Sequence, residues 1–295
     1  MLLDGVFSRV IGHGMILNGL IRLSLMLALV AGAAQAQQSE RLVWSDEFSS
    51  SAASVAPNPA NWTYEAGAGG WGNHELETYC SYGSSQPPCD ATKPNAFVGK
   101  DGYLHIVARS DGHGHFTSAR LKSQGLKSFQ YGRIEARIKI PKGQGFWPAF
   151  WMLGDSFEKV RWPACGEFDI MENIGKEPGT IHGSIHGTGF TGSQIGLPYT
   201  LPRGQAFGDA FHVFGLIWSP KKIQYYVDDP KNVYATFTPA SLPPGAVWPF
   251  DGGKFFFLLN LAVGGDWPGP PDASSKFPQE MLVDYVRGYA ESALY

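Results

Sequence analysis

Short runs of strand-forming residues, separated by turn residues, constrain the fold of this chain most strongly. The runs alternate apolar with polar residues or are continuously apolar, and no stretch sustains the 3.6-residue period of an amphipathic helix. They occupy residues 41–44, 103–108, 132–140, 212–218, 223–227, 255–261 and 281–289. No strand-helix-strand rhythm connects them, so we predict an all-β fold, an antiparallel sandwich, rather than an α/β fold.

Segments rich in Gly and Pro separate these runs. The chain has 37 Gly and 21 Pro, which suits short strands joined by tight turns. Residues 67–72, 189–196, 239–253 and 264–271 are predicted to form long loops around a cleft.

Size and charge limit the number of domains and the class of partner. The 295 residues, 43% hydrophobic and 17% charged, suffice for one large core, so we expect one domain. A formal net charge of −3, with scattered Lys and Arg, gives no basic field, so no nucleic-acid partner is expected. The nine Trp residues suit either a core or stacking against sugar rings.

The N-terminal residues have the pattern of a secretory signal. Arg22 precedes the apolar stretch 23–34, and small residues follow at the expected cleavage site. We assign residues 1–36 to a signal peptide, with Met15 as an alternative start, and residues 37–295 to the mature domain. The apolar stretch is too short to span a bilayer comfortably. The mature protein is therefore expected to be secreted, extracellular or periplasmic, with no membrane partner.

Export permits a disulfide among the three cysteines. Cys80 and Cys89 flank a turn-rich segment and are predicted to pair. Cys165 is expected to be a small core residue rather than a nucleophile, because no His lies at a telling spacing from it. Nothing in the sequence resembles a zinc site.

Three carboxylates within six residues form the most distinctive chemical motif. On a strand, Glu167 and Asp169 would share one face, with apolar residues on the other. Glu172 has the opposite parity and would face the core unpaired, at a high cost. One extra residue at Ile170 or Met171 would form a β-bulge and re-aim it. We predict this bulge, which brings the three acids to one face.

The alternative is an ordinary solvated strand face. Trp147, Trp151, Trp162 and Cys165 make the surrounding sequence too apolar for a wet surface, so we favour a cleft. Paired carboxyl groups are what a sugar-cleaving site requires, and in retaining glycosidases they lie about 5–5.5 Å apart.

Two neighbouring segments predict strands with defined faces. In residues 146–152, Trp147 and Trp151 share a face and leave a flat slot in which a pyranose ring could stack, although both could belong to the core. Pro148 between them predicts an edge or irregular strand. Residues 133–140 alternate charged with apolar side chains, which predicts a structural strand with one wet face.

These motifs resemble glycoside hydrolase family 16, specifically its laminarinase-like endo-β-1,3-glucanases. The run Glu-Phe-Asp-Ile-Met-Glu at 167–172 is similar to the bulged active-site signature of the family. Further similar segments, in family order, are residues 42–48, 70–76, 117–121, 131–153, 212–228, 256–265 and 281–289. The resemblance implies a β-jelly-roll sandwich of two antiparallel sheets, with a concave substrate cleft, as a single catalytic domain.

The resemblance also implies roles for the acids. Glu167 matches the nucleophile, Glu172 the general acid/base, and Asp169 the residue that tunes the pair. Three crowded carboxylates cannot all ionise easily, so one should keep a proton for the leaving oxygen.

Position in the family motifs implies further cleft residues. These substrate-binding candidates are Trp71, Asn73, Glu75, Arg120, Trp147, Trp151, Trp162, His186, Asn260 and Trp267. His182 has the same parity as His186 and competes for its role, and either could be structural. The segment around them lacks the His-Trp pair of many laminarinases.

The implied function is that of a secreted, monomeric, retaining endo-β-1,3-glucanase acting on laminarin-type or mixed-linkage β-glucan. Catalysis would require no cofactor. Glu47 and Asp284 match the region where some members bind a structural Ca²⁺, although both could be surface or capping carboxylates. The alternatives are a transglycosylase or a galactan or lichenan hydrolase of the same fold, and a non-catalytic β-glucan-binding protein.

Overall fold

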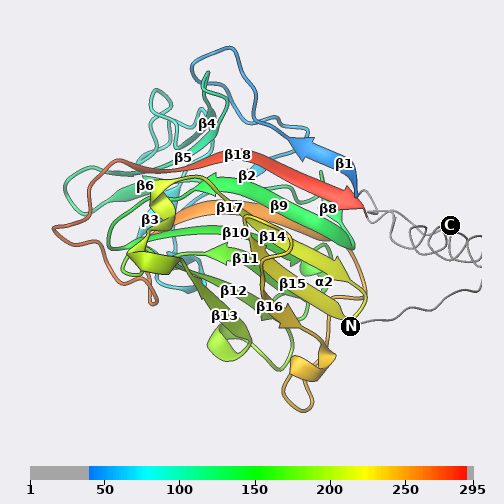
Figure 1. Cartoon of the computed structure of the whole chain (residues 1–295). Helices are drawn as coiled ribbons and strands as arrows, with labels where there is room; N and C mark the ends of the chain where they lie inside the picture. The colour runs from blue at the N-terminus through cyan, green and yellow to red at the C-terminus, as the bar shows by residue number, and fades with distance from the viewer. Residues whose placement is uncertain (1–39, 291–295) are drawn as a thin grey trace, which may run out of the picture. The chain divides into compact units, whose positions relative to one another are not determined.

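Two stacked β-sheets carry almost all of the regular structure. The computed structural model describes residues 40–290, so the predicted signal peptide at 1–36 and the alternative start at Met15 lie outside the described residues. The strands form two layers, one over the other (Figure 1). The predicted all-β jelly-roll sandwich is confirmed.

The larger sheet has ten strands. Eight follow the order β16-β15-β14-β9-β18-β5-β6-β3, while β1 pairs with β18 and β4 with β5. β3 and β6 run parallel. The strands are β1 (Arg41–Asp46), β3 (Glu77–Tyr79), β4 (Ala96–Val98), β5 (Leu104–Ser110), β6 (Phe116–Ser118), β9 (Gly132–Lys139), β14 (His212–Ser219), β15 (Lys222–Val227), β16 (Val233–Phe237) and β18 (Gln279–Ala290).

The smaller sheet has eight strands in the order β13-β12-β11-β10-β17-β7-β2, with β8 paired to β17. They are β2 (Thr63–Glu65), β7 (Arg120–Lys122), β8 (Ser128–Phe129), β10 (Phe146–Gly154), β11 (Glu167–Glu172), β12 (Thr180–His186), β13 (Gly196–Thr200) and β17 (Phe255–Val263). All the runs predicted to be strands are strands, namely β1, β5, β9, β14, β15, β17 and β18.

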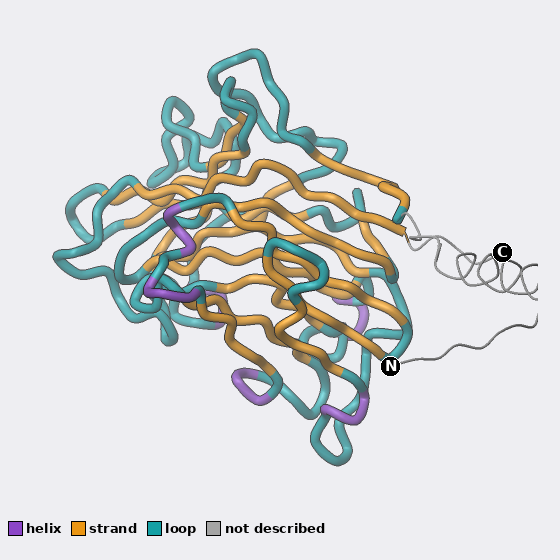
Figure 2. The backbone as a smooth tube through the Cα atoms, in the orientation of Figure 1, coloured by secondary structure: helices purple, strands orange, loops and turns teal. Residues whose placement is uncertain are grey.

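Helical structure is confined to short connections (Figure 2). The described residues contain one α-helix, α2 (Phe157–Val160), and the 3-10 turns η1 (Gly70–Gly72), η2 (Gly192–Gln194), η3 (Pro202–Gly204), η4 (Phe207–Asp209) and η5 (Pro239–Ser241). None of these helices could cross a bilayer.

The inner faces of the two sheets meet in one core. Phe150 of β10 and Phe168 of β11 enter it from the smaller sheet, and Ile134 of β9 and Leu216 of β14 enter it from the larger one. All four side chains are fully buried. Because side chains alternate along a strand, the intervening residues of β10 and β11 point away from this core, toward the outer face of the smaller sheet.

Pro148 lies in an interior strand, so the edge-strand alternative predicted for it is wrong, whereas β10 does pair irregularly with β11 between Phe150 and Trp151. β10 lies between β11 and β17. The Pro148 carbonyl accepts the N–H of Asn173 at 3.2 Å, and a strand residue points its nitrogen to the same side as its carbonyl. Asn173 follows Glu172, the last residue of β11. The missing N–H of Pro148 therefore faces the end of β11, where it removes no bond from the ladder.

The charged face of β9 is not uniformly wet, which corrects a second expectation. Glu135 is only 6% exposed. It accepts hydrogen bonds from Arg133, from Tyr226 at 2.5 Å and from Tyr289 at 3.2 Å. Gly215, paired with both Glu135 and Tyr226, leaves the space that the Tyr226 ring crosses, since a Cβ there would lie 2.0 Å from the ring. Long-range neighbours thus bury a residue that local alternation places in solvent.

Candidate active site

A β-bulge in β11 brings the three acids to one face, as predicted. Opposite β11, Trp151 of β10 pairs with Asp169, and the preceding Phe150 pairs with Met171, so Ile170 is the extra residue. The pairing of β11 with β12 shifts at the same place. Glu172 is thereby turned out of the core, where Ile170 and Met171 are fully buried in its place.

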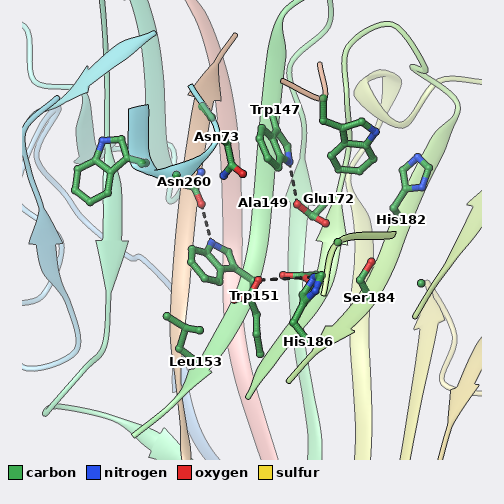
Figure 3. Close-up of a pocket in the computed structure, with 18 of the residues that line it drawn as sticks. Asn73, Trp147, Ala149, Trp151, Leu153, Glu172, His182, Ser184, His186 and Asn260 are labelled. Atoms are coloured by element: carbon green, nitrogen blue, oxygen red, sulfur yellow. Dashed lines mark hydrogen bonds and ion pairs between the residues drawn. The ribbon is translucent and has the colours of Figure 1, made fainter. Parts of the chain in front are cut away.

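The three acids line a cleft of about 830 Å³ on the outer face of the smaller sheet (Figure 3). All ten predicted substrate-binding residues line it as well. Three of the four predicted loops contribute to its wall, whereas residues 239–253 contribute none.

Sequence reasoning missed several cleft residues. They are Glu65, Leu153, Phe157, Ser184, Leu197, Pro198 and Ala262. Ser184 could have been found, because it shares the strand parity of His182 and His186. Leu197 and Pro198 belong to β13, in a segment whose sequence gave no alignment to a known motif.

His186 is the cation of the acid cluster. Its Nε2 lies 2.8 Å from an Asp169 oxygen and 4.0 Å from a Glu167 oxygen. Burial by itself lowers the pKa of His186, but the charges of Asp169 and then Glu167 outweigh burial and raise the pKa to about 9. The ring is therefore an imidazolium at neutral pH.

The two glutamates hold their protons more tightly than exposed glutamates do. Burial, followed by the charge of Asp169, raises the pKa of Glu172 to about 8, against the opposing effects of His186 and Trp147. The same causes raise the pKa of Glu167. Trp147 Nε1 donates to Glu172 at 3.0 Å, as Figure 3 shows. The His186 cation, 4.0 Å from Glu167, opposes the rise in both pKa values.

His182, the other candidate for the role of His186, lies elsewhere in the cleft. Its Nε2 lies 3.1 Å from Glu177, and its ring meets Trp267 edge-on at 4.9 Å between centroids. His182 lies opposite Glu172 in the pairing of β11 with β12, but of the two histidines only His186 forms an ion pair with the three acids.

Aromatic rings and one arginine line the cleft on the other side of the acids. The Arg120 guanidinium lies 4.7 Å from the Trp151 ring centroid and 5.0 Å from that of Trp71. Its Nε is 2.6 Å from Glu65. Arg120 is thus held between two rings and a carboxylate, an arrangement that braces both rings. Trp162, in contrast, is 47% exposed and near His186, so its ring is available for stacking.

The two predicted calcium ligands are each engaged by an arginine. Glu47 accepts two hydrogen bonds from Arg287, at 2.9 and 2.8 Å. Asp284 accepts one from Arg137 at 2.5 Å. This arrangement does not fit a calcium site, because a cation would have to displace both guanidinium groups. A structural Ca²⁺ at these residues stays a prediction.

Glu167, Asp169 and His186 are the one described group whose ligand atoms lie close enough together to hold a metal. His186 binds a metal only as neutral imidazole. A metal there would therefore compete with the proton that the neighbouring acids hold on the ring.

The cysteines behave as structural residues. Cys80 and Cys89 form a disulfide. Cys165 is buried and free, and burial followed by the charge of Glu167 raises the pKa of its thiol to about 11. A thiol with that pKa is not a nucleophile at neutral pH.

Comparison with known proteins identifies the family. The model described as Glycosyl hydrolases family 16 matches residues 86–277. The β-glucanase of Rhodothermus marinus is 39% identical over 260 residues, which cover 84% of this chain and 84% of that protein. The solved laminarinase catalytic domain of Thermotoga maritima is 41% identical, with a TM-score of 0.75 over 86% of this chain and 100% of that chain. The solved endo-β-1,3-glucanase of Pyrococcus furiosus is 44% identical, with a TM-score of 0.74 over 86% and 96%. This chain belongs to glycosyl hydrolase family 16.

Proposed function

We propose that this protein is a retaining endo-β-1,3-glucanase that hydrolyses laminarin-type or mixed-linkage β-1,3(4)-glucan by double displacement. The observation that carries the proposal is the bulge in β11, which turns Glu167 and Glu172 toward one cleft. Retaining glycosidases need such a pair of carboxyl groups at the scissile bond. The relatives, a β-glucanase, a laminarinase and an endo-β-1,3-glucanase, supply the substrate class.

In the proposed mechanism Glu172 acts as acid and then as base. Its raised pKa leaves it protonated at neutral pH, so it can donate to the glycosidic oxygen while the Glu167 carboxylate attacks the anomeric carbon. Glu172 then takes a proton from water, and the water oxygen displaces Glu167 from the glycosyl intermediate. Two displacements at the same carbon give net retention of configuration. Asp169, between the two, raises both glutamate pKa values and holds His186.

The extent of the cleft supports action within a chain. Its lining comes from seven strands of the smaller sheet that lie side by side, from Pro198 of β13 to Glu65 of β2. With strands about 4.8 Å apart, this path is roughly 29 Å long. A polysaccharide can therefore lie across the sheet on both sides of the acids, over roughly 10 Å toward β13 and roughly 19 Å toward β2.

Sugar release from laminarin tests the proposal. The wild type should release reducing ends from laminarin, and Glu167→Gln and Glu172→Gln should lose that activity by several orders of magnitude while melting normally. Glu158→Gln is the matched control, because Glu158 lies on exposed α2 and pairs only with exposed groups. Proton NMR of the first product should show the β-anomer. An α-anomer, or full activity in either acid variant, would contradict the mechanism.

The same assay separates the alternatives. A non-catalytic glucan-binding protein would bind laminarin and release nothing, with or without Glu167. A transglycosylase would give longer oligosaccharides when acceptor is added, and a galactan or lichenan hydrolase would prefer agar or lichenan over laminarin in the same panel.

We also propose that the protein is exported and acts as a monomer without a cofactor. The Cys80–Cys89 disulfide suits an oxidising compartment. N-terminal sequencing of protein from the medium or periplasm should find a start near Gln37, and light scattering should give the mass of one chain. Protein retained in the cytoplasm with Met1 or Met15 intact would contradict the export proposal.

A further inference from the structure

A second carboxylate pair lies in the molecule apart from the three acids. Glu77 of β3 is 1% exposed, and Glu75, two residues before it, is 8% exposed and lines the cleft. The two residues have the same parity, and an interaction with the Glu75 side chain contributes to the raised pKa of Glu77. Two carboxyl groups can share a hydrogen bond only if one of them carries a proton.

The surroundings place that proton on Glu77. One Glu77 oxygen accepts the Val263 N–H at 2.6 Å, while the other accepts no N–H or O–H group of residues 40–290 and is the oxygen left to carry a proton toward Glu75. No Lys, Arg or His forms an ion pair with it in the same residues. Glu75 instead accepts two side-chain donors, Asn73 Nδ2 at 3.2 Å and Tyr79 Oη at 2.9 Å. Because Glu75 already accepts these two donors and Glu77 has no cation beside it, the proton of the pair belongs on Glu77.

Burial and charge agree with this assignment. Burial, followed by the charge of Glu75, raises the pKa of Glu77 to about 9. The titratable groups that face the pair are Tyr79, Glu172 of β11, whose pKa the charge of Glu75 helps to raise, and, toward Tyr79, Arg120 of β7. The other packed strands, β6 and β17, have no titratable side chain.

A directed chain of hydrogen bonds connects this pair to the cleft wall. Trp151 Nε1 donates to Asn260 Oδ1 at 2.7 Å, a contact drawn in Figure 3. Asn260 Nδ2 donates to Tyr79 Oη at 3.1 Å, and Tyr79 in turn donates to Glu75. Each hydrogen bond in this series has a fixed donor and a fixed acceptor, and Glu75 is the final acceptor. The orientation of the Trp151 ring therefore depends on Glu75 remaining an acceptor at a fixed place.

We propose that Glu77 is a positioning residue: its carboxyl group, kept neutral beneath the cleft, donates to Glu75 and fixes both the Glu75 carboxylate, as the acceptor for a sugar hydroxyl, and the Trp151 ring. The inference rests on the proposed function, because it assigns Glu75 to a hydroxyl of the bound glucan. An ionised Glu77 would place a second negative charge against Glu75 and push the acceptor away. Substrate binding should then fail at high pH.

Glu77→Gln separates this role from simple packing. The Gln amide can donate to Glu75 and its carbonyl can accept the Val263 N–H, but the side chain cannot ionise. Two proteins are compared: the inactive Glu172→Gln variant, and the same variant with Glu77→Gln added. The Glu172→Gln change prevents turnover and removes the titration of Glu172 from both. Binding of laminarihexaose is then measured by calorimetry from pH 6 to pH 10.

The two proteins should bind within about twofold of each other at pH 7. At pH 10, one unit above the Glu77 pKa, the protein with Glu77 should bind about tenfold more weakly than its Gln counterpart. Superimposable pH curves would overturn the role of Glu77. Glu77→Leu, which neither donates nor accepts, should weaken binding at every pH; undiminished binding by a folded Leu variant would also overturn it.

Failure of the proposed function gives a different result. If the wild type released no sugar from laminarin, the glucanase proposal would fall whatever the binding curves showed. If it released sugar and the two binding curves coincided, only the inference about Glu77 would fall.

Discussion

Replacing His186 with glutamine removes the cation that the acid cluster contains. The imidazolium lies 2.8 Å from Asp169 and 4.0 Å from Glu167, and the acids raise its pKa from 6.5 to about 9. That shift corresponds to about 3 kcal/mol of attraction between the ring and the acids. Coulomb's law gives a similar figure, about 4 kcal/mol at 4 Å with an effective dielectric constant of 20.

The loss should appear as a displaced pH profile. His186 lowers the pKa of both Glu167 and Glu172, so its removal raises both. Shared among three acids, about 3 kcal/mol amounts to roughly one pH unit each. The dependence of kcat/KM for laminarin on pH should be bell-shaped, and both of its limbs should move to higher pH by about one pH unit in the variant. Activity on the acid side should therefore fall about tenfold.

Stability should change with pH in a defined direction. A histidine whose pKa is raised on folding contributes its full stabilisation below pH 6.5, and the contribution is lost as the pH rises through about 9. Urea unfolding of His186→Gln should therefore show a deficit of up to about 3 kcal/mol near pH 6 that shrinks toward zero near pH 10.

His182→Gln is the matched control. His182 lies four residues earlier on the same strand and also faces the cleft, but it pairs with Glu177. The same change there should leave both limbs of the profile in place, whatever its effect on KM. A uniform drop in activity for His186→Gln, with unmoved limbs and a pH-independent stability deficit, would refute the electrostatic role.

Three further predictions concern single contacts. Trp147→Phe keeps an aromatic ring but removes the N–H that donates to Glu172 at 3.0 Å. The pKa of Glu172, and with it the alkaline limb of the kcat profile, should therefore rise by up to about one pH unit. A limb that moves down or stays in place would show that this hydrogen bond does not set the pKa. Glu135→Ala should cost about 3–5 kcal/mol in urea unfolding, because it leaves buried donors unpaired; a cost under about 1 kcal/mol would show that the cluster is not structural. Replacing Cys80 and Cys89 together with Ser should cost about 3 kcal/mol, the loop-closure value for about ten residues, and an unchanged melting temperature would contradict it.

The features that followed from sequence are those that depend on one strand at a time. The parity of Glu172 relative to Glu167 demanded a bulge, because a regular strand would have buried a lone carboxylate. The structure places the extra residue at Ile170, one of the two positions considered. The shared face of Trp147 and Trp151 follows from the same alternation.

The features that sequence missed depend on what lies across the sheet. Alternation assigned Glu135 to a solvated face, but it could not reveal that Tyr226 reaches over Gly215 from two strands away. It could not show that the end of β11 accommodates Pro148. It also gave no reason to separate Glu75 from Glu77, which share a parity but differ in donors.

This distinction explains why the acids of one chain have such different protonation. A strand's periodicity fixes the face to which a carboxyl group points, whereas its pKa depends on burial and on the donors and charges that its own strand and its neighbours bring to that face. The pKa of Glu172, the proposed catalytic acid, is raised to about 8, and that of Glu77 is raised to about 9 where no cation forms an ion pair with it. Glu47 shows the reverse: its hydrogen bonds to Arg287 lower its pKa. The protonation of Glu172 is therefore set jointly by Asp169 of its own strand, which raises its pKa, and by His186 and Trp147 of the neighbouring strands, which lower it.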